Sequence, residues 1–156
     1  MQKPEPVPGL VIRYDYLWRD EAAQGRQEGA KERPCAVIVA KRVEDGKPPL
    51  VLLAPITHSP PTNPKMAIEI PAKVKRHLGL DDERSWIITG ELNSVAWGDP
   101  GIVPVSRDRW DYGLLPTKLA TNVRDEVAER QRTRSLGITD RVLLEKQRDR
   151  DGGRGF

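Results

Sequence analysis

The first two thirds of the chain alternate between short apolar runs and polar turns. Two of these runs, Arg33–Lys41 and Leu50–Thr57, are nearly continuous, which is typical of strands buried on both faces. Pro34 fits the first position of a strand, and the Asp-Gly pair between the runs favours an antiparallel hairpin. We therefore expect Arg33 and Thr57 at neighbouring strand ends, where binding sites are often formed.

Later in the chain the apolar period becomes helical. Leu115, Leu119, Val123 and Val127 are spaced by four, so we expect an amphipathic helix of roughly 16 residues. A shorter helix is expected over residues 71–80, because proline stands at its start and Gly79 near its end. For the polar stretch 19–32 a loop is preferred, and a helix around residues 21–24 is the alternative. Further strands are expected at about residues 9–18, 67–70, 85–97 and 102–105, with a bend at Gly90.

Five to seven short strands with tight turns, followed by one helix, predict a mainly β fold: a small barrel or rolled sheet with a C-terminal helix. Residues 1–8 hold three prolines and are expected to form an extended arm before a domain of residues 9–134. Apolar content falls after Arg134. Residues 135–156 are therefore expected to be a polar, partly disordered tail, with a weak helix over 138–146.

The net charge of the chain does not by itself indicate a nucleic-acid-binding protein. The formal net charge of the 156 residues is +3, and residues 124–156 supply +2 of it, with nine Lys/Arg against seven Asp/Glu. Any RNA or DNA site must therefore be a local basic patch. The chain has one cysteine, which rules out an internal disulfide and a cysteine-based zinc site. Cys35 lies inside an apolar run, so a buried, inert thiol is expected.

Targeting signals are not evident in the sequence. Residues 1–8 lack the apolar core of a signal peptide, and no segment approaches the roughly 18 apolar residues of a membrane helix. We expect a soluble, cytoplasmic protein with no membrane partner.

Three motifs along the chain together suggest a family. The first is a Gly-x-x-x-Arg-Pro entry into a buried strand, the second a strand that ends in Pro-x-Thr, and the third a later apolar strand. In the sequence these are Gly29-Ala30-Lys31-Glu32-Arg33-Pro34-Cys35-Ala36-Val37-Ile38, Leu53-Ala54-Pro55-Ile56-Thr57 and Leu92-Asn93-Ser94-Val95-Ala96-Trp97. In this order and at comparable spacing, they resemble the PemK/MazF family of toxins from toxin–antitoxin pairs, over about residues 8–130.

The resemblance implies an SH3-like barrel with a C-terminal helix, usually a homodimer. It also implies a metal-independent endoribonuclease, without cofactors, that cuts single-stranded RNA. In that family the 2′-hydroxyl of the RNA attacks the adjacent phosphorus and leaves a cyclic phosphate and a free 5′-hydroxyl. A cognate antitoxin would cover the RNA groove.

This chemistry needs a positive charge for the phosphorane oxygens, a base and a proton donor. Arg33 suits the first task because its guanidinium is always charged and matches two phosphate oxygens; the alternative is a surface arginine paired with Glu28 or Glu32. Thr57 could orient a phosphate oxygen, or simply cap the strand end. Glu28 could act as the base or position Arg33, and His58 suits proton transfer near neutral pH.

A basic cluster could contact the RNA backbone, although a solvated helix face is the alternative. The residues expected to bind RNA are Lys31, Lys73, Lys75 and Arg76. One departure from the family pattern weakens the catalytic hypothesis. Gly90 and Glu91 stand where many members carry an acidic residue and a glutamine, so either Glu91 replaces a catalytic aspartate or the centre is reduced to Arg33 and Thr57. Two alternatives stay open: an inactive barrel that binds nucleic acid or protein, and a peptide groove lined by the four tryptophans.

Overall fold

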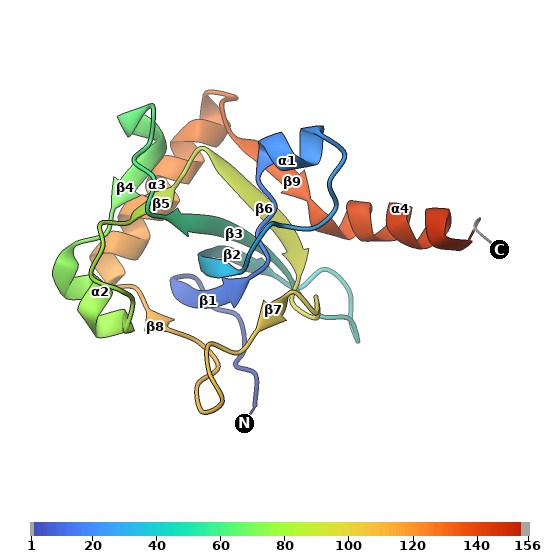
Figure 1. The fold of residues 1–156 in the computed structure, drawn as a ribbon, viewed down its shortest axis with the longest axis horizontal. Coiled ribbons are helices and arrows are strands. Elements are labelled where there is room, and N and C mark those ends of the chain that lie inside the picture. The colour runs from blue at the N-terminus through green and yellow to red at the C-terminus, as the bar shows by residue number, and fades with distance from the viewer. Residues whose placement is uncertain (1, 154–156) are drawn as a thin grey trace.

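The computed structural model describes residues 2–153, and the side chains of residues 2–150. The fold is mainly β, as predicted, with nine strands joined in one sheet and four α-helices in this part of the chain (Figure 1). In chain order the elements are β1 (Leu10–Tyr14), α1 (Arg19–Ala23), β2 (Arg33–Lys41), β3 (Leu50–Thr57), the 3-10 turn η1 (Pro64–Met66), β4 (Ala67–Glu69), α2 (Ala72–Leu78), β5 (Trp86–Ile88), β6 (Glu91–Ala96), β7 (Ile102–Val103), β8 (Gly113–Leu114), α3 (Thr117–Arg132), β9 (Gly137–Asp140) and α4 (Arg141–Gly153).

Strand β3 is the centre of the sheet. It pairs with β2 through Leu50–Pro55, with β6 through Leu50–Leu53, and with β5 through Ile56 and Thr57. The main strand order is β4-β5-β3-β2-β1-β7, with β8 also on β1 and β9 on β6. The pairings are antiparallel except for β6 with β9, which is parallel. Among the described strands these pairings do not close into a barrel.

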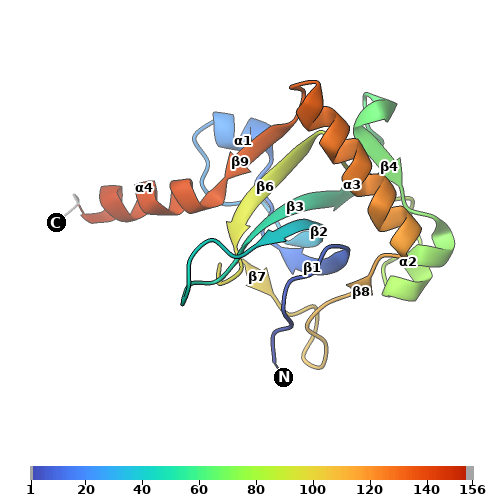
Figure 2. The same cartoon turned by 180° about the vertical axis from the view of Figure 1, so that it is seen from behind.

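The apolar runs of β2 and β3 are buried on both faces of the sheet, as predicted. Ala36 and Ile38 face the cluster formed with α2 and α3, whereas Cys35 and Val37 face a second cluster with Tyr14. Helix α3 covers the first face and has the 16 residues expected from its period, with Val123 and Val127 buried (Figure 2). Complete burial raises the pKa of the Cys35 thiol, in agreement with an inert cysteine.

One feature of each of the helices α1 and α2 explains why that helix begins or ends where it does. Helix α2 ends at Gly79, whose φ of 70° is left-handed, as its C-terminal glycine predicts. Helix α1, in contrast, forms where a loop was expected. The Glu91 carboxylate accepts a hydrogen bond from Arg19 N at 3.1 Å, so a residue distant in sequence satisfies a free amide of the first turn.

The C-terminal segment differs from the expected polar tail. Residues 137–140 form β9, and α4 follows at once and runs outward from the sheet (Figure 1). The low apolar content of this segment suggested disorder, but all four residues of β9 pair with β6. The predicted tail also includes residues 154–156, which lie outside the described residues.

Residues 2–7 form no helix or strand, but they pack on the domain. The Lys3 ammonium lies 4.7 Å from the Trp97 ring centroid, and Trp97 Nε1 donates to Pro4 O at 3.0 Å. Within residues 2–153, no helix combines the length and the apolar character that crossing a membrane requires.

Candidate functional site

The hairpin of β2 and β3 brings Arg33 and Thr57 to the same end of the sheet. The β2–β3 ladder ends with Cys35 opposite Pro55, and Arg33 and Thr57 each lie two residues beyond this pair on the same side. Thr57 itself pairs with Trp86 of β5. The prediction from the two apolar runs therefore holds in its geometry. Both residues are half-buried, which leaves part of each side chain open to a ligand.

An open groove of about 690 Å³ lies at this end of the sheet. Arg33 and Thr57 lie in it together with two other residues that were expected in the site, Lys31 and His58. One wall is the proline-rich segment of residues 58–62, which continues directly from β3. The remaining lining residues are Trp18, Asp20, Glu32, Pro34, Ile56 and Ile88.

Within residues 2–150, the Arg33 side chain has no polar partner in the groove. Its guanidinium carbon lies 4.9 Å from the Trp18 ring centroid, and its buried Nε atom has no hydrogen-bond partner among these residues. Glu28 and Glu32, the expected alternative partners, instead pair with Arg148 at 3.1 Å and with Arg13 at 2.9 Å. A guanidinium that keeps its donors unused beside an open groove is suited to bind an anion.

Thr57 keeps one hydrogen-bonding function free. Its Oγ1 accepts a hydrogen bond from Ser59 N at 3.1 Å, which fixes the side chain at the start of the proline-rich wall. Within residues 2–150 the hydroxyl hydrogen has no acceptor, so it can be donated to a ligand oxygen. Arg33 and Thr57 thus offer charged and neutral donors from opposite strands.

His58 lies on the rim of the groove but is already engaged. Its Nε2 is 2.8 Å from Asp81 Oδ2 and 3.4 Å from Glu83 Oε2, and its Nδ1 is 3.1 Å from Arg84 O. Ser85 Oγ lies 3.0 Å from the same Nδ1. Both ring nitrogens therefore face oxygen atoms of the loop between α2 and β5, and neither is directed to Thr57.

The expected basic cluster on α2 does not act as one surface. Lys75 is buried, with 4% of its surface exposed, and donates to Asp81, Ser85 and the Glu83 carbonyl. Lys75 is therefore a structural residue. Its assignment as an RNA contact is wrong, because its ammonium already donates to three acceptors in the loop that follows α2. Lys73 and Arg76 are exposed on α2, and neither is among the residues that line the groove.

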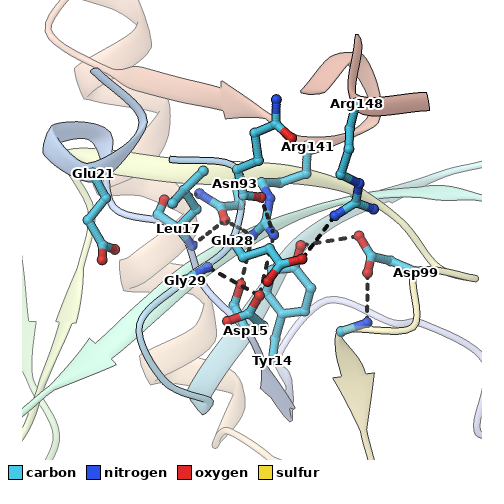
Figure 3. A network of polar contacts seen from close by, with 12 residues as sticks. Tyr14, Asp15, Leu17, Glu21, Glu28, Gly29, Asn93, Asp99, Arg141 and Arg148 are labelled. Carbon is cyan, nitrogen blue, oxygen red and sulfur yellow. Dashed lines mark hydrogen bonds and ion pairs between the residues drawn. The ribbon is translucent and has the colours of Figure 1, made fainter. Parts of the chain in front are cut away.

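Glu28 is directed away from the groove and joins a polar network under α4. Figure 3 shows its carboxylate on Arg148, with Arg141 reaching Asn93 and Asp15 beside it. Arg141 is only 7% exposed and also donates to the carbonyls of Asp15, at 2.7 Å, and Gln27, at 3.3 Å. The network fixes the loop that leads into Arg33, so Glu28 serves this loop rather than the groove in the described structure.

Glu91, considered as a replacement for a missing aspartate, is also engaged elsewhere. Its Oε1 accepts hydrogen bonds from Tyr16 Oη at 3.0 Å and from Arg19 N at 3.1 Å. Burial raises the pKa of Glu91, and the hydrogen bonds from Arg19 and Tyr16 oppose that shift only in part. The groove carboxylate without a hydrogen bond or ion pair within residues 2–150 is Asp20 of α1.

Sequence patterns missed Asp20 and the partners of His58. The polar stretch 19–32 carries no apolar period, and Asp81 and Glu83 stand in a charged turn that is like many solvated ones. The four tryptophans, a possible peptide groove from sequence, are separated: Trp18 lies in this groove, Trp86 in β5, and Trp97 and Trp110 beside Lys3.

Comparisons with known proteins do not identify a relative. No family model matches the chain, and no curated protein and no solved structure gives a significant match.

Proposed function

We propose that this protein is a metal-independent endoribonuclease that cleaves single-stranded RNA, a toxin of the PemK/MazF kind. The observation that carries the proposal is the Arg33 guanidinium, which lies in one open groove with Thr57 and has no polar partner within residues 2–150. The sequence resemblance assigns to these two positions the groups that handle the scissile phosphate. Here both occur at one end of the sheet with hydrogen-bond donors unused.

In the proposed reaction the 2′-oxygen of the RNA attacks the adjacent phosphorus and the bond to the 5′-oxygen breaks. Arg33 neutralises the charge that develops on the phosphorane oxygens, and Thr57 donates its hydroxyl hydrogen to one of them. The products are a 2′,3′-cyclic phosphate and a free 5′-hydroxyl. No water or metal is consumed in this step.

The acidic and basic side chains that line the groove carry out the proton transfers. Asp20 is a groove carboxylate that can accept the 2′-hydroxyl proton, whereas Glu28 and His58, the expected candidates, are held by Arg148 and by Asp81. Lys31 is exposed on the groove and can contact the RNA backbone or protonate the leaving oxygen.

The same proposal includes the fold family and the partners. The sheet with α3 on one face would be an opened form of the SH3-like barrel, in a cytoplasmic homodimer. A cognate antitoxin would cover the groove with an acidic or apolar segment over Arg33 and Thr57.

A second candidate function is that of a binding module without catalysis. It is favoured by the charge of the groove, where Lys31 and Arg33 are offset by Asp20 and Glu32. A site of nearly zero net charge attracts polyanions weakly.

The test is cleavage of single-stranded RNA by the full chain in excess EDTA, with the product ends identified. We expect 5′-hydroxyl ends, and a loss of about 100–1000-fold in rate for Arg33→Ala, because a charged donor to the transition state is removed. Arg84→Ala is the matched control, since Arg84 also lies over a tryptophan, 5.1 Å from the Trp86 ring centroid, but is paired with Glu69. The control should cleave as the unaltered protein does.

Absence of cleavage by the folded protein would contradict the nuclease. RNA binding that survives in that case, and that is weakened by Arg33→Ala, would favour the binding module.

A further inference from the structure

Three side chains at the rim of the groove direct metal-ligating atoms at a common point. His58 follows β3, and Asp81 and Glu83 belong to the loop between α2 and β5. One ligand atom from each lies within 4.8 Å of the other two. The His58 Nε2 atom is 2.8 Å from Asp81 Oδ2 and 3.4 Å from Glu83 Oε2.

These distances suit a shared ion. Zn²⁺ binds nitrogen and carboxylate oxygen at about 2.0–2.2 Å, which puts two ligand atoms roughly 3.4 Å apart in a tetrahedral site. The separation of His58 Nε2 from Glu83 Oε2 has this value. The shorter separation from Asp81 needs to open by roughly 0.6 Å for the same geometry, and both side chains are about half exposed and can move.

The second ring nitrogen of His58 is held by the same loop. Nδ1 lies 3.1 Å from Arg84 O and 3.0 Å from Ser85 Oγ, so the ring is oriented from the side opposite the carboxylates. With the hydrogen on Nδ1, donated to Arg84 O, Nε2 presents its lone pair to an ion between it and the carboxylates. A histidine whose other nitrogen donates to a backbone carbonyl is the usual form of a metal ligand.

Lys75 holds the loop in place without occupying the ligand atoms. Its ammonium donates to Asp81 Oδ1 at 2.6 Å, which leaves Oδ2 toward His58, and it also donates to Ser85 Oγ at 2.7 Å. Two carboxylates against one lysine leave one net negative charge for a divalent cation.

We propose that His58, Asp81 and Glu83 bind one divalent transition-metal ion of the Zn²⁺ class at the rim of the groove. One imidazole and two carboxylates favour such ions over Mg²⁺, which prefers an all-oxygen site. The ion connects the end of β3 to the loop after α2 and fixes the proline-rich wall that begins at His58. It is separate from the proposed cleavage chemistry, which needs no metal.

The experiment is calorimetric titration of the full, tag-free chain with Zn²⁺, with Co²⁺ as a spectroscopic probe and Mg²⁺ as a comparison. We expect one Zn²⁺ per chain, and a rise in melting temperature of about 5–10 °C at a Zn²⁺ concentration 100 times the dissociation constant. His58→Ala and Asp81→Asn should each weaken binding at least about 100-fold, more than loss of an outer partner does. His77→Ala and Asp82→Asn are matched controls, because His77 and Asp82 are exposed and outside the cluster.

Unchanged binding in His58→Ala, or equal losses in His77→Ala, would overturn the proposal. So would the absence of Zn²⁺ binding at millimolar concentration, which would mean that a proton alone lies between Nε2 and the carboxylates. These readouts do not involve RNA, so they are independent of the outcome of the cleavage test.

Discussion

Two arginines near the loop of residues 26–32 occupy contrasting environments. Arg141 and Arg33 each lie over an aromatic ring, Tyr14 at 5.2 Å and Trp18 at 4.9 Å from the guanidinium carbon. Arg141 also has three hydrogen bonds and an ion pair with Asp15 (Figure 3). Arg33 has none of these within residues 2–150, and its Nε atom is buried and unpaired.

The difference separates a residue that stabilises the fold from one that is available to a ligand. Burying a guanidinium is unfavourable unless its donors are satisfied, so the Arg141 network is the expected arrangement for a structural arginine. An arginine with unused donors at a groove makes little contribution to folding and retains its capacity to bind an anion. The comparison therefore predicts that the two residues fail in different assays.

The largest effect on stability is expected for Arg141→Ala. The substitution leaves Asp15, Asn93 and the Gln27 carbonyl without their shared donor, and the unfolding free energy should fall by about 3–5 kcal/mol. Urea denaturation measures this change. Arg148→Ala is the control, because its exposed pair with Glu28 is expected to contribute less than about 1 kcal/mol. If Arg33→Ala destabilised the protein as much as Arg141→Ala, the comparison would fail.

Thr57→Val sharpens the assignment of the groove. The substitution keeps the shape at the end of β3 but removes the hydroxyl, so RNA cleavage should slow by about 10–100-fold, less than for the charged Arg33. Initial rates on one RNA substrate measure it, with the unfolding free energy recorded in parallel. Thr62→Val, at the exposed far end of the wall, should retain the rate. A loss of stability that accounts for the whole loss of rate would count against the role of Thr57.

The smallest expected effect on stability concerns Glu91, whose carboxylate is partly buried and accepts two hydrogen bonds. Because burial raises its pKa in the folded state, folding favours its protonated form, and its contribution to stability falls as the pH rises above the ordinary value of 4.5. Glu91→Gln removes this dependence. The variant should therefore gain stability relative to the unaltered protein between pH 4 and 8, by up to about 1 kcal/mol after screening by solvent.

The comparison of unfolding free energies at several pH values tests this sign, with Glu5→Gln as the exposed control. A variant less stable by more than about 2 kcal/mol at pH 7 would instead mean that the hydrogen bonds from Tyr16 and Arg19 dominate.

The sequence predicts the β2–β3 hairpin well because its signals are local. A continuous apolar run, a proline at the first strand position and an Asp-Gly turn all act within a few residues, and they place Arg33 beside Thr57. The four-residue spacing of apolar side chains that predicts α3 is an equally local signal. These local signals could therefore predict that Arg33 and Thr57 share a groove. They could not predict that Arg33 is unpaired, because that depends on Glu28 and Glu32 pairing with other residues.

The rest depends on contacts between distant residues. Helix α1 is capped by its own Glu21, which accepts from Trp18 N at 3.0 Å, and also by the distant Glu91. Strand β9 and helix α4 contact β6 and the Arg141 network, which leave no pattern in a short window. Lys75 has the sequence appearance of a surface lysine, and only the fold of the following loop buries it. His58 likewise gains Asp81 and Glu83 from a segment more than twenty residues away.

The two adjacent prolines in the wall of the groove affect how a ligand would be bound. Each proline ring fixes one backbone dihedral, so Pro60 and Pro61 have few conformations to lose when a molecule settles against them. A wall built from glycine or serine would lose more conformational entropy on binding. We therefore expect a groove that keeps its shape before and after binding, so that association is limited by encounter with the ligand rather than by reorganisation of the loop.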